Sequence, residues 1–316
     1  MSKGGRDQGI QAALASALFL GLAPIFGRQA IGDFGFSPLA VVALRTSMAA
    51  VLLLVIVALF KRPFLYIYPA GLIGCTLAGV INGLGSILYY QSFQYLSASV
   101  GQLLYSLYPI FVALWLALDG ERPGRLTIVR IVLATGAAVL LTLGDATHIN
   151  RIGALMMLGA AALYGLHLPI NQRVLYDVPA PTVTLYTLLA MSAVVVPAYI
   201  IFDRQWPANP VLWPVVGLTL VTFLSRLTLF MGVKRIGGMQ TALLGLAELL
   251  VTLSLGYFWL GEKLTPLQWA GAGLLSITLL LVQFEKGRKP SKSNRGGWLK
   301  WLRPPGMPTD IWGRFD

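Results

Sequence analysis

Charged residues are scarce in this chain of 316 residues: Asp, Glu, Lys and Arg together make up 11%, while 56% of the residues are hydrophobic. A typical soluble domain has about 25% charged residues. This deficit excludes an ordinary soluble enzyme, a disordered protein and a nucleic-acid-binding module, so we expect no nucleic acid partner. The 34 glycines and 18 prolines follow no three-residue period, which excludes a collagen-like chain.

Cysteine and histidine are nearly absent as well. Cys75 is the single cysteine, and His148 and His167 are the two histidines. One thiol cannot form an intramolecular disulfide, and so few soft ligands do not make a transition-metal site. The sequence contains neither a phosphate-binding G-x-x-x-x-G-K-[ST] loop nor an H-E-x-x-H motif. We therefore expect no metal ion, no other cofactor and no catalytic residues.

Long hydrophobic runs dominate the sequence, and a helix that crosses a bilayer needs about 20 such residues. The runs are continuous rather than alternating, which disfavours a β-barrel. They predict an all-α integral membrane protein with ten transmembrane helices. We place these at residues 9–27, 38–60, 69–93, 98–118, 127–144, 152–172, 181–202, 210–233, 238–260 and 265–284. Residues 63–118 lack any charge and are too long for one crossing, so we divide them at residues 94–97.

The positive charges predict the orientation of these helices. The net charge is +12, and eight of the 24 Lys and Arg residues lie in a basic tail over residues 285–316. With the short N-terminal segment 1–8 placed inside, the inner segments before the tail carry nine Lys and Arg, and the outer loops carry four. Basic residues favour the cytoplasmic side. We therefore expect a multi-pass protein of the cell membrane, either plasma or bacterial inner membrane, with both termini cytoplasmic and an uncleaved first helix.

The two halves of the chain resemble each other. Residues 19–28 and 164–173 share an aromatic residue, a Pro-Ile pair and an arginine at an offset of 145. Gly120-Glu121 and Gly261-Glu262 follow the fourth and ninth runs at an offset of 141. Because each half holds five helices, the second half enters the membrane from the opposite side. Residues 9–144 and 151–284 are therefore predicted to form two inverted five-helix repeats, which is typical of secondary transporters with a site near the midplane.

The order of these motifs resembles the drug/metabolite transporter superfamily, in its branch with two tandem EamA domains, over roughly residues 9–284. The likeness rests on the two Gly-Glu pairs, the Gly/Ala-rich runs after them, Arg45 and Ala247-Glu248. Two positions depart from the pattern: Leu20-Gly21 stands where tryptophan-glycine is common, and Leu249 where proline usually follows the glutamate. The resemblance implies ten helices, cytoplasmic termini, a central cavity and export of small metabolites or amino acids.

Two charged residues lie deep in the predicted membrane region. Glu248 is about ten residues into the ninth run, about 15 Å from its inner end. Arg226 lies at a similar depth in the eighth run. A charge at such depth is costly unless it faces protein or water, so we expect the two to pair. The pair is either a coupling and binding site, with Glu248 taking a proton or a substrate amine, or a fixed structural ion pair. For Arg45, near the outer end of the second run, we favour extension to the lipid headgroups.

Uncharged polar and aromatic residues complete the predicted cavity lining. Spacings of three and four place such groups on one helix face. The full set of predicted cavity residues is Glu248, Arg226, Gln102, Tyr105, Tyr108, Tyr164, His167, Tyr89, Asn82 and Gln240. Interhelical hydrogen bonding is the alternative for the polar members, and a neutral structural histidine for His167. Pro24, Pro109 and Pro169 are candidate gating bends, with static kinks as the alternative, and the Gly79-x-x-x-Gly83 pair predicts helix packing.

These features predict a transporter for a small organic solute, with the bilayer as its other partner. A monomer suffices for this architecture. A membrane enzyme acting on lipid-borne substrates would need clustered acids, whereas Asp119, Glu121, Asp145 and Glu262 are scattered between both sides. A non-transporting receptor or scaffold remains an alternative. An exchanger of phosphorylated metabolites would need several cavity cations, and Arg226 is the one predicted there.

Overall fold

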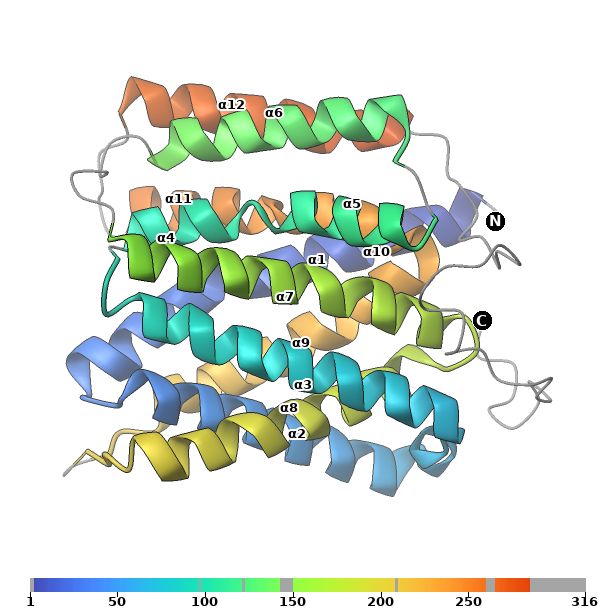
Figure 1. Cartoon of the computed structure of the whole chain (residues 1–316), viewed down its shortest axis with the longest axis vertical. Coiled ribbons are helices and arrows are strands. Elements are labelled where there is room, and N and C mark those ends of the chain that lie inside the picture. Colours follow the sequence, from blue (N-terminus) through green and yellow to red (C-terminus); the bar gives the residue numbers. More distant parts are fainter. Residues whose placement is uncertain are drawn as a thin grey trace.

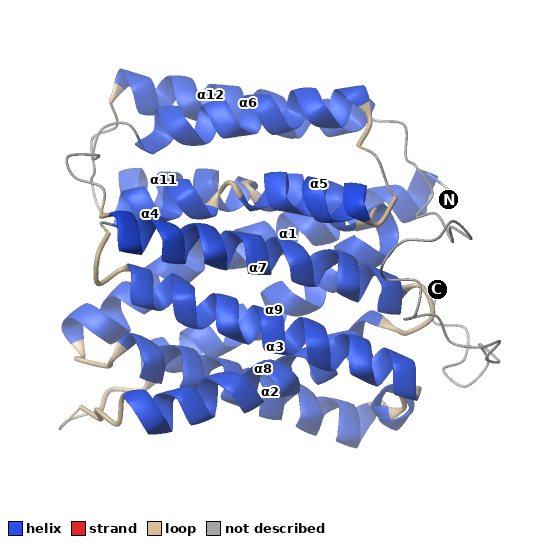
Figure 2. Ribbon diagram, viewed as in Figure 1, coloured by secondary structure: helices blue, strands red, loops and turns tan. Residues whose placement is uncertain are grey.

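The computed structural model describes residues 3–96, 98–120, 123–142, 150–207, 210–259 and 265–284, and within these ranges every regular element is a helix (Figure 2). The α-helices are α1 (Lys3–Arg28), α2 (Pro38–Phe60), α3 (Pro69–Ser92), α4 (Ala98–Tyr105), α5 (Tyr108–Leu118), α6 (Arg125–Thr142), α7 (Arg151–Leu175), α8 (Ala180–Phe202), α9 (Trp213–Ile236), α10 (Gly238–Gly245), α11 (Ala247–Trp259) and α12 (Pro266–Leu280). Three short segments are a π-helical turn, η1 (Gln29–Asp33), and the 3₁₀ turns η2 (Arg62–Leu65) and η3 (Leu281–Phe284).

Each of the ten predicted hydrophobic segments falls on a helix or a pair of helices. Within the described ranges, six helical stretches are long and apolar enough to cross a membrane, and α5 and α12 are shorter apolar helices. The longest of the six have 23–25 residues, or about 35 Å at 1.5 Å per residue, which matches a hydrocarbon core of about 30 Å. The chain is therefore a multi-pass membrane protein. The basic tail 285–316 and the segment 143–149 lie outside the described residues.

Two segments predicted as single helices are broken. The fourth divides into α4 and α5 at Ser106-Leu107, and the ninth into α10 and α11 at Leu246. Pro109 explains the first break, because proline lacks the N–H that would bond to the carbonyl one turn earlier; Ile110 N instead donates to Leu107 O at 2.9 Å. The second break has no proline. Leu249 N donates to Leu246 O at 3.0 Å, a bond between residues three apart, as at the first break.

The helices lie roughly parallel to one another in one bundle (Figure 1). At one edge α6 packs against α12, and at the opposite edge α2 packs against α8. Between these edges α1 runs along α9 and α3 runs along α7. α3 also packs on α8, α2 on α9, α5 on α7 and α1 on α11.

The first described helix begins at one end of this bundle, and the last described helix finishes at that same end. This end is called here the terminal end. Arg6 Nη2 donates to Val282 O at 2.6 Å, which joins the start of α1 to η3. The first turns of α8 also bind the α2–α3 connection at η2, since Thr182 Oγ1 donates to Phe64 O at 2.8 Å and Tyr186 Oη to Leu65 O at 2.6 Å.

The predicted packing role of the Gly79-x-x-x-Gly83 pair is confirmed. A Cβ atom added at Gly79 would lie 2.5 Å from the backbone oxygen of Thr187 in α8, and one at Gly83 would lie 3.0 Å from the Val194 Cβ atom. The two glycines therefore let the backbones of α3 and α8 approach closely, as small residues do in membrane helix pairs.

Gly79→Ala is expected to destabilise the protein, although alanine is the better helix former by about 0.5–1 kcal/mol, because its methyl group would overlap the α8 backbone. Gly273→Ala on α12 is the matched control, since a Cβ there meets no atom within 4 Å. Thermal unfolding in detergent should show a lower midpoint for the first variant and an equal or higher one for the second. Equal midpoints for both variants would contradict the close approach of α3 and α8.

Candidate functional site

The two broken helices touch where each is interrupted. Tyr108, the first residue of α5, donates from its hydroxyl to Ala242 O in α10 at 2.8 Å. A Cβ atom at Gly245, the last residue of α10, would lie 2.5 Å from that hydroxyl, so a larger residue there would displace the Tyr108 hydroxyl. Glu248 follows in the first turn of α11. The site is thus built from helix ends, where backbone N–H groups are left without helical partners.

Four predicted cavity tyrosines form one aromatic cluster around this crossing, called here the tyrosine cluster. The ring centroids of Tyr105 lie 4.8 Å from Tyr89, 5.8 Å from Tyr108 and 5.5 Å from Tyr164, and those of Tyr108 and Tyr164 are 5.0 Å apart. These separations are typical of favourable aromatic pairs. Gln102 joins the cluster, because its Oε1 accepts from Tyr89 Oη at 3.3 Å.

Glu248 faces this cluster. Its carboxylate lies within electrostatic range of all four tyrosines and of Arg226. The residue keeps part of its surface accessible, whereas its chain neighbours Ala247 and Leu249 are buried. The side chain of Glu248 therefore adjoins the tyrosine cluster, and the residue as a whole is only partly covered.

Arg226 is placed near Glu248 but does not form the predicted ion pair. Among the described residues no ion pair within 4 Å joins the two charges, whereas Arg173 and Asp119 do form one elsewhere in the bundle. The guanidinium carbon of Arg226 lies 5.5 Å from the Tyr164 ring centroid, and its Nη1 atom is buried without a hydrogen-bond partner. The site therefore holds opposite charges that do not neutralise each other by direct contact.

His167 adjoins the same site from α7. Its ring lies 4.7 Å from the Tyr164 ring, and its Nδ1 donates to Tyr164 O one turn earlier. The side chain is fully buried, and Nε2 has no hydrogen-bond partner. One ring nitrogen is thus held by the backbone, while the other stays available.

Two predicted cavity residues lie outside this site. Asn82 is buried between α3 and α8, where its Nδ2 donates to Met191 Sδ at 3.4 Å. Gln240 accepts from Arg130 Nη1 of α6. Both side chains connect helices, because α3 and α10 turn these positions toward neighbouring helices rather than toward the tyrosine cluster.

The three predicted bends differ in structure. Pro109 is the second residue of α5 and follows a real break. Pro169 is buried inside α7, which continues through it from Arg151 to Leu175. Helix α1 likewise continues through position 24, and the side chain of Pro24 lies outside the described part of the chain.

Two buried basic residues were missed by the sequence analysis. Arg173 donates from Nε to Asp119 Oδ2 at 2.9 Å and also from Nη2 to the same oxygen, and both residues are buried. Arg130, fully buried in α6, donates from Nε to Thr278 O of α12 at 3.1 Å. The sequence placed Arg173 and Asp119 at loop ends and Arg130 inside a run, and only the three-dimensional packing brings each to its partner.

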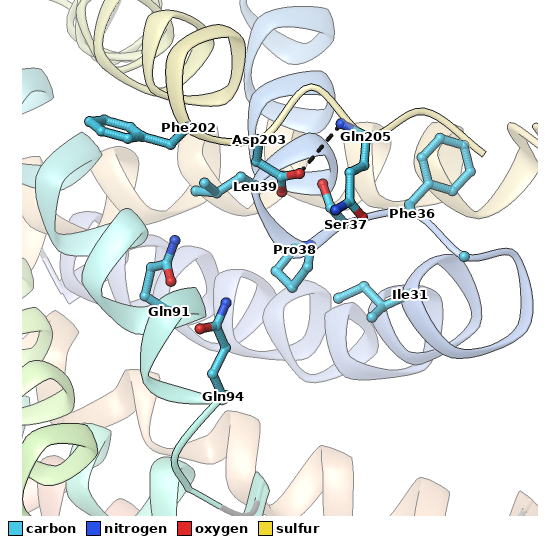
Figure 3. A pocket seen from close by; sticks show the side chains of 11 residues that line it. Ile31, Phe36, Ser37, Pro38, Leu39, Gln91, Gln94, Phe202, Asp203 and Gln205 are labelled. Atoms are coloured by element: carbon cyan, nitrogen blue, oxygen red, sulfur yellow. Dashed lines mark hydrogen bonds between the residues drawn. The ribbon is translucent and has the colours of Figure 1, made fainter.

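A cavity of about 390 Å³ opens at the end of the bundle opposite the terminal end (Figure 3). Its polar lining includes Gln91 and Gln94 at and after the end of α3, Asp203 and Gln205 after α8, and Ser37 before α2. Figure 3 shows the two α3-side amides across from Asp203, whose carboxylate accepts from Gln205 N at 3.4 Å.

Arg45 lies over the ring of Tyr90 inside the bundle instead of extending to the headgroups as we expected. Its guanidinium carbon lies 5.2 Å from the ring centroid of Tyr90, the neighbour of Gln91, and its Nε is buried without a partner. The Tyr90 ring in turn lies 5.1 Å from that of Tyr89. The aromatic contacts of the tyrosine cluster therefore extend through Tyr90 to Arg45.

Residues 7–143 and 151–284 each match the EamA-like transporter family. The chain belongs to this family. The EamA chain is 23% identical over 216 residues to the uncharacterized transporter YcbK of Bacillus subtilis (strain 168), covering 64% of this chain and 69% of that protein. It is 24% identical over 170 residues to the uncharacterized transporter YwfM of the same organism, covering 53% and 57%.

A solved crystal structure also shares the fold of the EamA chain. The TM-score is 0.75 at 16% sequence identity, and the match covers 88% of this chain and 97% of that one. Family membership and the names of both relatives thus agree on a transporter. Among the described residues, no three His, Cys, Asp or Glu side chains lie close enough together to hold a metal ion.

Proposed function

We propose that this protein is a secondary transporter that exports small organic solutes by alternating access. One observation carries the proposal: Glu248 and Arg226 face a partly accessible, tyrosine-lined site where two broken helices cross. In transporters, solute sites near the midplane are commonly formed by such discontinuous helices. No cofactor is required, since the solute gradient or a proton gradient supplies the driving force.

Ten membrane crossings in two inverted repeats are supported by the helix neighbours. Under an exchange of halves, α1 corresponds to α7, α2 to α8, α3 to α9, α4–α5 to α10–α11, and α6 to α12. Each contact between two helices then has a counterpart between the corresponding helices. The counterpart of α1–α9 is α7–α3, that of α3–α8 is α9–α2, and that of α5–α7 is α11–α1. All six pairs are in contact. The α6–α12 and α2–α8 pairs map onto themselves. The two helix breaks also correspond.

In this proposal the described conformation faces outward. The terminal end is cytoplasmic, as the positive charges predict, and it is closed by the buried Arg173–Asp119 ion pair between α7 and the end of α5. The opposite end carries the cavity of Figure 3. Exchanging the conformations of the two halves would close this cavity and open the cytoplasmic side, so that the site faces each side in turn.

The chemistry of the site favours solutes that carry an amine and a carboxylate, such as amino acids. The Glu248 carboxylate can bind an ammonium group, and the free Nη1 of Arg226 can bind a carboxylate. The four tyrosine rings suit an apolar or aromatic portion between them, and can add cation–π attraction to the ammonium group.

The test is counterflow in proteoliposomes loaded with panels of amino acids, amines, organic acids and sugars, with and without a pH gradient. We expect exchange of zwitterionic solutes well above that of empty liposomes. A rate that follows the imposed pH gradient would assign proton coupling, and a rate indifferent to it would assign the solute gradient. No movement of any solute class would overturn the proposal in favour of a receptor or scaffold.

A further inference from the structure

Several buried polar atoms near α7 have no hydrogen-bond partner among the residues that the structure describes. These atoms are His167 Nε2, Asn171 Nδ2, Arg226 Nη1 and Tyr68 Oη. His167 and Asn171 are fully buried, Tyr68 is 2% exposed and Arg226 is 9% exposed. Buried polar groups in folded proteins nearly always bond to protein or to ordered water, and internal waters usually occupy sites with several otherwise unsatisfied partners.

These atoms follow one another through the bundle. Arg226 lies over the Tyr164 ring, and Tyr164 contacts His167. Asn171 is one helical turn beyond His167, about 6 Å along α7. Its Oδ1 accepts from Thr187 Oγ1 of α8 at 3.2 Å. The central site is thus continued by polar side chains toward the terminal end.

The same row reaches the terminal end through α3. The Thr187 side chain lies close to the Cys75 thiol, and Tyr68 lies within electrostatic range of Cys75 and of Asp177. Tyr68 directly precedes α3, and Asp177 lies in the α7–α8 connection. Cys75 is seven residues further along α3, and Thr187 is seven residues into α8, so both lie about 10 Å deep. Asn171 and His167 lie four and eight residues from the end of α7, or about 6 Å and about 12 Å, so these polar groups together lie between the connection and the depth of His167.

We propose that these groups hold a file of internal water molecules that joins the solvent at the terminal end to His167 and Arg226. The path is called here the α7 water file, and it runs past Asp177, Tyr68, Cys75, Thr187 and Asn171. Water supplies the missing hydrogen bonds, while the Arg173–Asp119 ion pair keeps larger molecules out at this end. The file gives water, and protons carried by it, a route to the central site that solutes do not share. The proposal of this water file does not depend on whether the protein transports a solute.

Cys75 is the only cysteine of the chain, so its S–H stretching band in the infrared spectrum reports on water access at one position of the file. The experiment transfers the purified full-length protein in lipid nanodiscs into D₂O and follows conversion of S–H to S–D. The dry control is Cys75→Ala/Ala49→Cys, because Ala49 is fully buried in an apolar cluster between α2 and α8. A second reporter, Cys75→Ala/Asn171→Cys, tests the inner part of the path; Cys75→Ala/Thr187→Cys replaces it if that variant does not fold.

We expect the Cys75 thiol and the second reporter to exchange at least about tenfold faster than the thiol in the dry control, which exchanges only when the structure opens locally. Exchange of Cys75 as slow as the dry control would overturn the proposal. Fast exchange at Cys75 with slow exchange at the second reporter would also overturn it, since the path would then end before the central site.

Discussion

Glu248→Gln is expected to reduce solute transport about 10- to 100-fold while leaving the protein folded. The carboxylate faces the four tyrosines and Arg226, and a hydrogen bond to a charged group contributes about 1.5–3 kcal/mol, where each 1.4 kcal/mol is tenfold in binding. The amide keeps the shape of the side chain and loses its charge. The measurement is initial-rate counterflow in proteoliposomes, with equal amounts of reconstituted protein confirmed by gel filtration.

Asp33→Asn is the matched control, because it removes an acidic charge at the exposed end of η1, away from the tyrosine cluster. This variant should transport at the wild-type rate, and Glu248→Asp should retain more activity than Glu248→Gln. Equal transport by Glu248→Gln and wild type would remove Glu248 from the solute site and leave it with a structural role.

Arg173→Met is expected to destabilise the protein by about 3–5 kcal/mol, the usual cost of leaving one charge of a buried pair without its partner. Asp119 and Arg173 are both buried and joined by two hydrogen bonds to one carboxylate oxygen. Replacing both by apolar residues of similar size, in Asp119→Leu/Arg173→Met, should restore much of the loss. Thermal or denaturant unfolding in detergent measures the difference.

The control for this prediction is Arg204→Met, since Arg204 is exposed and its Nε donates to Ile200 O one turn earlier in the chain. Its stability should stay close to that of the wild type. If the double variant were less stable than Arg173→Met alone, the ion pair would not account for the cost. In the outward-facing proposal, the double variant should also open the cytoplasmic side more readily.

The fold was largely predictable because the membrane imposes it. Only helices satisfy backbone groups in lipid without a closed barrel, so hydrophobic length alone located α2 and α3 to within a residue at each end. The helix breaks were not predictable from length. Pro109 was a visible signal for the first, whereas the break at Leu246 has no local signal and coincides with the contact between Gly245 and Tyr108.

The candidate site was only partly predictable. Spacing placed Gln102, Tyr105 and Tyr108 together, and the structure gathers them with Tyr89 and Tyr164. Depth in the membrane brought Glu248 and Arg226 to the same level, but depth does not give direction around the helix axis, so their separation was missed. For the same reason the sequence did not predict the partners of Gln240 and Arg130. These contacts depend on the orientation of α6, α10 and α12 about their own axes.

Side-specific labelling of the central site tests alternating access most directly. Gln102→Cys in a Cys75→Ala background places one thiol beside Tyr89 in the tyrosine cluster. A small membrane-impermeant thiol reagent is then applied to oriented membrane vesicles, once from the cytoplasmic side and once from the outer side. Alternating access predicts labelling from either side and protection by transported solute; labelling from one side only, or from neither, would contradict it.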